Sequence, residues 1–215
     1  MPAKYRTSAQ VIENFQVRPD DVWVVTFPKC GTTWTQEMVW QICNDLDYEK
    51  GNSTELHERF PFFDLLRILA IYAPYDSHII DFWNMRNEDN ILFFTYEEMK
   101  KNLPNVIRRA TEFLGKCYTD EQITSLADHL SLEKMSKNES INRVEELDDY
   151  YKKIKFNKDK DYNFIRKGKV GSFHQEMTPD VVKECDTWIR NRIAKYQDDP
   201  HLLEIFLANT CLNIF

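Results

Sequence analysis

Residues 22–34 (VWVVTFPKCGTTW) join an apolar run to a short loop and then to the start of a helix, and this feature constrains the chain most. The β-branched and aromatic run Val22–Phe27 is typical of a buried strand, which Pro28 ends. Gly31 permits a tight turn where a side chain would collide with a bound group. The apolar face expected on the following helix consists of Met38, Val39 and Ile42.

This loop has the composition of an anion-binding site. The free N–H groups and the dipole of a helix start attract an anion, and Lys29 adds a full positive charge beside them. Thr32 and Thr33 add hydroxyl groups. The lysine precedes the loop's single glycine, unlike the order Gly-x-x-x-x-Gly-Lys-Ser/Thr, so an ATP-using P-loop kinase is disfavoured.

Two segments carry a resemblance to a known family. Pro28–Trp34 (PKCGTTW) resembles the 5′-phosphosulfate loop of the cytosolic sulfotransferases, which transfer sulfonate from 3′-phosphoadenosine-5′-phosphosulfate (PAPS) to hydroxyls or amines. Phe164–Gly171 (FIRKGKVG) resembles the family's Arg-Lys-Gly-x-x-Gly segment, which holds the nucleotide's 3′-phosphate. The likeness covers most of residues 15–192 and is nearest to arthropod-like members.

The resemblance implies a fold, a cosubstrate and a set of site residues. The fold is α/β, a P-loop-like parallel β-sheet flanked by helices, as a single sulfotransferase domain over residues 1–215. PAPS is the cosubstrate and adenosine 3′,5′-bisphosphate (PAP) the product, with no metal. Lys29 is implied to be catalytic as well as cofactor-binding. The implied cofactor-binding residues are Lys29, Cys30, Gly31, Thr32, Thr33, Trp34, Tyr96, Ser131, Arg166, Lys167 and Gly168.

One block of the family pattern is absent. Phe63-Asp64 runs almost directly into Leu65, so several dozen residues are missing around positions 64–67. They include the family's catalytic histidine and the arginine and serine that also bind the 3′-phosphate, so the sheet is expected to be incomplete. Two interpretations stay open: a short sulfotransferase acting on a small hydroxyl or amine acceptor, or a catalytically silent form that binds PAPS or PAP.

None of the five histidines restores the missing base by position, and each is expected to be a surface or packing residue. They are His57, His78, His129, His174 and His201. His174 is the leading exception, although the family has a lysine there. Of the family's dimer signature only Thr178 is present, which leaves a homodimer open.

Composition and charge are those expected of a cytoplasmic protein. Five scattered cysteines indicate reduced thiols, and no apolar leader or membrane span stands out. Cys30, beside Lys29, is a candidate for a lowered pKa, although a passive small filler is preferred. The net charge is −7, yet residues 152–169 hold eight basic and two acidic residues. A basic mouth on an acidic body suits an anionic nucleotide rather than nucleic acid.

Local patterns predict further elements. We expect a second core strand over Ile91–Thr95 and a helix that begins at Tyr96. An amphipathic helix with Phe113 on its apolar face is expected over Pro104–Leu114, ended by Gly115. Further helices are expected from a capping box at Thr119 and Gln122 to Leu130, and as the final helix after Thr178, with Val182, Cys185, Ile189 and Ile193 on its buried side.

Overall fold

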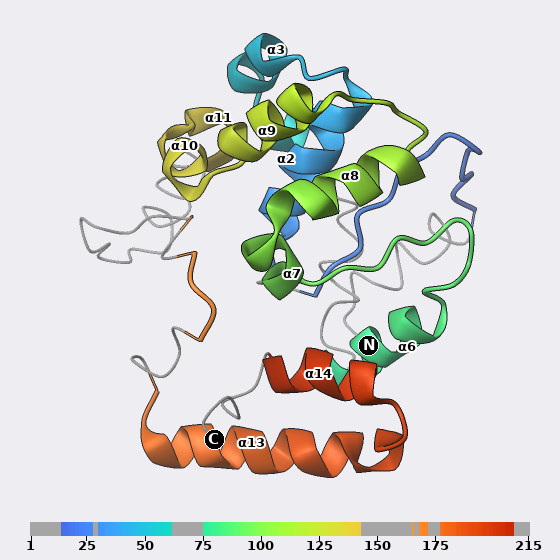
Figure 1. Ribbon diagram of the computed structural model, residues 1–215, viewed down its shortest axis with the longest axis vertical. Coiled ribbons are helices and arrows are strands. Elements are labelled where there is room, and N and C mark those ends of the chain that lie inside the picture. The colour runs from blue at the N-terminus through green and yellow to red at the C-terminus, as the bar shows by residue number, and fades with distance from the viewer. Residues whose placement is uncertain are drawn as a thin grey trace.

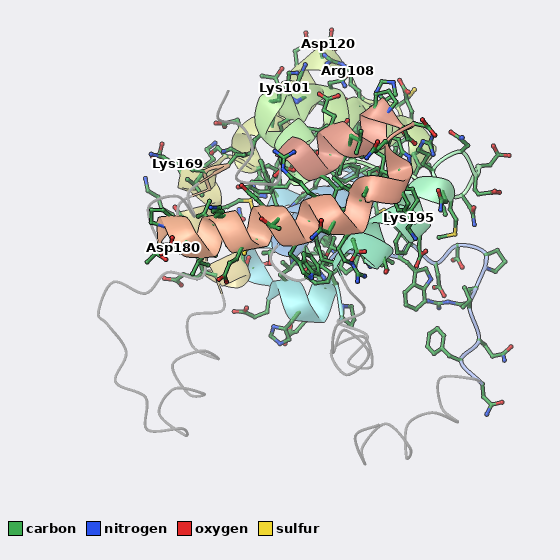
Figure 2. The ribbon with its side chains drawn as sticks, turned by 90° about the horizontal axis from the view of Figure 1, so that it is seen from below. Lys101, Arg108, Asp120, Lys169, Asp180 and Lys195 are labelled. Carbon is green, nitrogen blue, oxygen red and sulfur yellow. The ribbon has the colours of Figure 1, made fainter. Side chains whose placement is uncertain are left out.

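The computed structural model describes residues 14–27, 30–61, 75–142, 165, 168–171 and 177–208. Lys29, Arg166, Lys167, His174 and positions 64–67 lie outside these ranges. Helices dominate the described part (Figure 1). They are α2 (Thr32–Cys43), α3 (Tyr48–Ser53), α4 (Leu56–Arg59), α6 (Tyr75–Asn84), α7 (Tyr96–Lys101), α8 (Leu103–Phe113), α9 (Asp120–His129), α10 (Leu132–Lys137), α11 (Glu139–Asn142), α13 (Pro179–Ile193), the 3₁₀ turn η2 (Ala194–Tyr196) and α14 (Pro200–Ala208).

The larger core surrounds α2, which packs against α8, while α8 packs against α9. The predicted apolar face of α2 is confirmed, because Met38 and Ile42 are fully buried and Val39 nearly so. Helix α8 is confirmed as amphipathic, with a buried face of Val106, Ile107 and Ala110. Phe113 corrects that prediction, since its side chain is 41% exposed at the end of the helix.

Side chains cap the N-termini of two predicted helices. Thr119 accepts a hydrogen bond from the Gln122 N–H while the Gln122 side chain accepts one from the Thr119 N–H, so the capping box is confirmed. An equivalent box between Thr95 and Glu98 begins α7 at Tyr96, as expected. Gly115 follows α8 at φ +66°, a left-handed conformation that favours glycine. Local chemistry therefore determines where these helices begin and end.

A buried charged cluster fixes α2 against its neighbours. The carboxylate of Glu37, fully buried, accepts hydrogen bonds from Arg59 at 2.8 Å, His129 at 2.8 Å and Gln41 at 2.9 Å. Burial acts to raise the pKa of Glu37, but the bond from His129 and the charge of Arg59 outweigh it and hold the pKa below its usual value. Arg59 also lies over the Trp40 ring at 4.4 Å.

A second, smaller core joins α6, α13 and α14, which lie together at one end of the molecule in Figure 1. Its buried side chains are Ile79, Ile80, Ile193, Leu202 and Phe206. The Arg192 Nε donates to Asp76 at 2.7 Å and ties α13 to α6. Helix α13 begins at Pro179 as predicted, but it is not the final helix, because α14 follows, and Cys185 is exposed.

The expected strands are not confirmed. Within the residues described, no segment is assigned as a strand, and 22–27 and 91–95 have no regular secondary structure. A strand exists only when a neighbour completes its hydrogen-bond ladder. Around Phe93, a side chain does part of this work, since Arg109 of α8 donates to the Phe93 carbonyl at 2.8 Å. No described helix is long and apolar enough to cross a bilayer.

Candidate nucleotide site

The start of α2 presents the predicted anion-binding geometry. Gly31 is the N-cap residue at φ +89°, and the Thr35 N–H donates the first bond of the helix to the Gly31 carbonyl at 3.0 Å. The N–H groups of Thr32, Thr33 and Trp34 therefore have no partner within the helix. No acidic side chain occupies the first turn of α2. An anion placed here would meet three N–H donors and the positive end of the dipole.

The residues around the loop hold its shape. The hydroxyls of Thr26 and Thr32 share a short hydrogen bond, which joins the segment before the loop to the helix after it. The Cys30 N–H donates to the Phe27 carbonyl at 3.1 Å, so the chain turns before Gly31. A hydroxyl has one donor and two acceptor lone pairs, so Thr32 retains hydrogen-bonding capacity for a ligand.

Cys30 corrects one possibility that the sequence suggested. Burial raises the pKa of its thiol to about 11, and the nearby Glu97 acts in the same direction. The thiol therefore stays protonated near neutral pH, and Cys30 acts as a small filler rather than a reactive thiolate.

Trp34 connects the loop to Tyr96, a predicted site residue distant in sequence. The Tyr96 ring stands edge-on to the Trp34 ring, with centroids 5.4 Å apart. A Cβ atom on Gly31 would lie 3.0 Å from the Tyr96 ring, so only glycine lets this ring come so close. Gly31, Trp34 and Tyr96 thus form one surface.

The same tryptophan reaches the junction between α9 and α10. Its indole Nε1 donates to the Leu130 carbonyl at 3.0 Å. The next residue, Ser131, caps α10 by accepting from the Lys134 N–H at 3.3 Å. Gly168, at φ +56°, packs so closely on Leu132 of α10 that a Cβ atom there would lie 2.8 Å from the leucine side chain. The glycine of the second motif therefore lies against the helix that Ser131 begins.

The structure thus brings together eight of the eleven predicted residues, namely Cys30, Gly31, Thr32, Thr33, Trp34, Tyr96, Ser131 and Gly168. The other three, Lys29, Arg166 and Lys167, lie outside the described residues. Lys100, which the sequence interpretation missed, has its ammonium 5.6 Å from the centre of the Trp34 ring. The signal was its position four residues after Tyr96, on the same face of α7.

Among the four described histidines, one lines the cavity that borders the loop. This cavity has a volume of about 460 Å³, and its lining includes His78, Cys30 and Thr35. His129 instead donates to Glu37, as described above. No cluster of metal-ligating side chains occurs within the described ranges.

The chain matches a family model described as a sulfotransferase domain, over residues 19–71 and 66–197. The two matched parts meet where the sequence predicts the missing block. Luciferin sulfotransferase of Photinus pyralis is 24% identical over 284 aligned positions, which cover 88% of this chain and 76% of that protein. Because this alignment is longer than the 215-residue chain, the relative has many residues opposite gaps here. Sulfotransferase 1E1 of Bos taurus is 23% identical, covering 81% of this chain and 84% of that one.

Solved structures show the same fold. A retinol dehydratase in complex with retinol and PAP superimposes with a TM-score of 0.73 at 24% identity, covering 89% of this chain and 86% of that one. A mouse sulfotransferase, SULT7A1, in complex with PAP gives a TM-score of 0.61 at 17% identity, with 91% of both chains covered.

Proposed function

The chain belongs to the sulfotransferase family, and we propose that it transfers sulfonate from PAPS to a hydroxyl or amine of a small acceptor. The observation that carries the proposal is the set of contacts made by Trp34. Trp34, in the first turn of α2, contacts the Tyr96 ring and donates a hydrogen bond to the Leu130 carbonyl. Leu130 precedes Ser131, and Gly168 packs on Leu132 just after it. An adenosine bisphosphate needs this combination of an aromatic surface and separate anion sites.

Each part of the nucleotide has a proposed partner. The N–H groups of Thr32, Thr33 and Trp34, with Lys29, hold the 5′-phosphosulfate. Arg166 and Lys167, with the backbone of Gly168, hold the 3′-phosphate, because two cations and a closely approaching backbone suit a dianion. The rings of Trp34 and Tyr96 offer surfaces against which adenine packs. PAP bound in the neighbouring structures supports this assignment.

The proposed chemistry is an in-line displacement at sulfur. The acceptor oxygen or nitrogen gives up its proton to a base or to water and forms the new bond to sulfur, while the bond from sulfur to the bridging oxygen breaks and PAP leaves with that electron pair. Lys29 and the amides at the start of α2 neutralise the charge that develops on the bridging oxygen. This displacement requires no metal.

The wider setting is proposed with the same reasoning. We place residues 1–215 in one domain around an incomplete parallel sheet, in the cytoplasm, with a small-molecule acceptor and no nucleic acid or membrane partner. The homodimer stays open, because of the family's dimer signature only Thr178 is present.

Calorimetry with PAP tests the nucleotide site. Replacing Lys29 by alanine is expected to weaken PAP binding by about 1.5–3 kcal/mol, the range for a hydrogen bond to a charged group. Lys101→Ala, which removes an exposed lysine of α7, is the matched control and should bind like the unaltered chain. Equal affinities for the Lys29 variant and the control would contradict the proposal.

Competition with related nucleotides tests the 3′-phosphate site. If Arg166 and Lys167 hold this phosphate, PAP should bind more tightly than adenosine 5′-phosphate, and Arg166→Ala should reduce that difference. Equal binding of ATP and PAP would favour a kinase-like nucleotide site instead.

The second candidate function is a catalytically silent form that binds PAPS or PAP. The family match is divided into two parts that overlap at residues 66–71, next to the positions where the sequence lacks the family's catalytic histidine, and this favours it. A missing general base typically lowers a rate by about a hundred- to ten-thousand-fold. Transfer of labelled sulfonate from PAPS to a panel of phenols, alcohols and amines, with Lys29→Ala as the blank, distinguishes the two candidates.

A further inference from the structure

A cavity of about 460 Å³ opens beside the nucleotide site, within the size range of small-molecule pockets. Its walls come from the segments 22–27 and 90–95 and from the helices α2, α6, α7 and α8, with one residue of α14. Cys30 and Thr35 belong to its lining, so the cavity borders the first turn of α2. A molecule bound there would lie next to the proposed 5′-phosphosulfate position.

The lining of this cavity is mostly apolar and includes several aromatic rings. Two of its residues, Val22 and Val25, keep 42% and 41% of their surface exposed, while its buried floor includes Val39, Met99 and Ala110 of the larger core. A ligand that covers such side chains gains free energy in proportion to the apolar area it removes from water. The further apolar lining includes Phe27, Tyr75, Phe82, Leu92, Phe93 and Phe94.

His78 is the histidine of this cavity. Its ring contacts the Phe27 ring at 5.9 Å and the Phe82 ring at 5.1 Å, and Phe27 also contacts Tyr75 at 5.0 Å. Phe27 ends the segment that leads into the anion-binding loop. The ring that His78 contacts therefore belongs to a residue close to this loop in the chain. Burial lowers the pKa of His78, against the opposing charge of Asp81, which favours the neutral imidazole, the form that accepts a proton.

We propose that this cavity binds the acceptor, a flat apolar molecule with one hydroxyl, and that His78 takes the proton from this hydroxyl. The inference rests on the proposed sulfonate transfer. The acceptor oxygen forms a bond to sulfur, its proton passes to the His78 imidazole, and the bond from sulfur to the bridging oxygen of PAPS breaks. PAP leaves with that electron pair, and the imidazolium later releases its proton to water.

Binding of 2-naphthol to the PAP-saturated chain, measured by calorimetry, tests the cavity. Val25→Trp places a large ring on an exposed lining residue and should weaken naphthol binding by at least about tenfold, by filling the space. Val17→Trp is the matched control, since Val17 is 66% exposed and does not line the cavity. Both variants should bind PAP like the unaltered chain, which also reports that they fold.

Turnover of labelled PAPS with 2-naphthol tests His78. His78→Gln should lower kcat by about a hundredfold or more, the usual range for a general base, while PAP binding and the naphthol Kd change little. His201→Gln, at an exposed position of α14, is the control and should leave kcat unchanged.

The outcomes separate the cavity and His78 from the proposed function. If naphthol does not bind, or binds the Val25→Trp variant with unchanged affinity, the cavity is not the acceptor site. The nucleotide site is still supported in that case if PAP binds. Equal turnover of the His78 variant, or no turnover of the unaltered chain with both ligands bound, overturns the role of His78. Failure to bind PAP refutes the proposed function itself.

Discussion

Helix α2 borders two regions that differ in how completely the described chain encloses them. Toward α8 and α9 its side chains meet a core in which Ile42, Ile107 and Leu126 have no exposed surface. Toward the segments 22–27 and 90–95 lies the open cavity, with Val22 and Val25 more than two-fifths exposed. The side of α2 toward α8 and α9 is therefore packed, whereas the cavity beside the first turn of α2 leaves lining side chains for a ligand to cover.

This contrast has a cause in the chain's order. Helices α8, α9 and α10 follow one another over residues 103–137 and contact each other through short connections. The cavity walls instead include segments almost seventy residues apart, and the family match changes between these segments from its first part to its second, which overlap at residues 66–71. The contrast predicts that changes on the packed side alter the stability of the fold, whereas changes on the cavity side alter ligand binding.

The largest expected effect is the removal of the Glu37 carboxylate. Glu37→Ala leaves the Arg59 guanidinium, whose side chain is 2% exposed, buried without its partner. Breaking a buried pair in this way destabilises a protein by about 3–5 kcal/mol, which urea denaturation measures. Glu133→Ala, which breaks an exposed pair with Lys137 on α10, should leave the denaturation midpoint unchanged. Equal midpoints for the two variants would contradict the contrast.

A smaller effect of the same carboxylate should follow pH. Because the folded pKa of Glu37 is lowered from its usual 4.5, its contribution is complete above that value and is lost as pH falls through the folded pKa. The unaltered chain should therefore lose more stability below about pH 4.5 than the Glu37→Gln variant, which has no carboxylate there to protonate. If the unaltered chain and the Glu37→Gln variant lose stability in parallel as the pH falls, Glu37 is not the source of the pH dependence.

Gly31 tests the edge between the two regions. Gly31→Ala must adopt φ +89° and also place a Cβ atom 3.0 Å from the Tyr96 ring, so we expect a loss of about 1–2 kcal/mol, with weaker PAP binding. Gly115→Ala shares the positive φ at +66° but meets no atom within 4 Å, so it should lose stability and keep PAP affinity. Calorimetry that finds PAP binding unchanged in both variants would separate Gly31 from the site.

The smallest effect concerns the helix caps. Thr119→Ala removes a capping bond in the packed region and should cost about 1 kcal/mol. Thr178 precedes α13 without a side-chain capping bond, so Thr178→Ala should have almost no effect on the melting temperature. A larger loss at Thr178 than at Thr119 would reverse the order that the structure predicts.

The sequence by itself determined the features that depend on neighbouring residues. The start of α2 at Gly31, the capping box of Thr119 and Gln122, and the buried face of α8 follow from the chemistry of a few adjacent side chains. The two phosphate motifs identified the family for the same reason, since each is a continuous segment. The sequence interpretation was less accurate where burial mattered, as exposed Phe113 and Cys185 show.

Only the tertiary structure decided which distant groups meet. No pattern in the sequence pairs Trp34 with the carbonyl of Leu130, sets Gly168 against Leu132, or buries Glu37 with Arg59 and His129. The same holds for His78, which the sequence placed with packing residues and which the fold puts into a cavity beside the loop. Such contacts depend on how whole helices pack, because burial and the hydrogen bonds that satisfy buried groups are properties of the assembled chain.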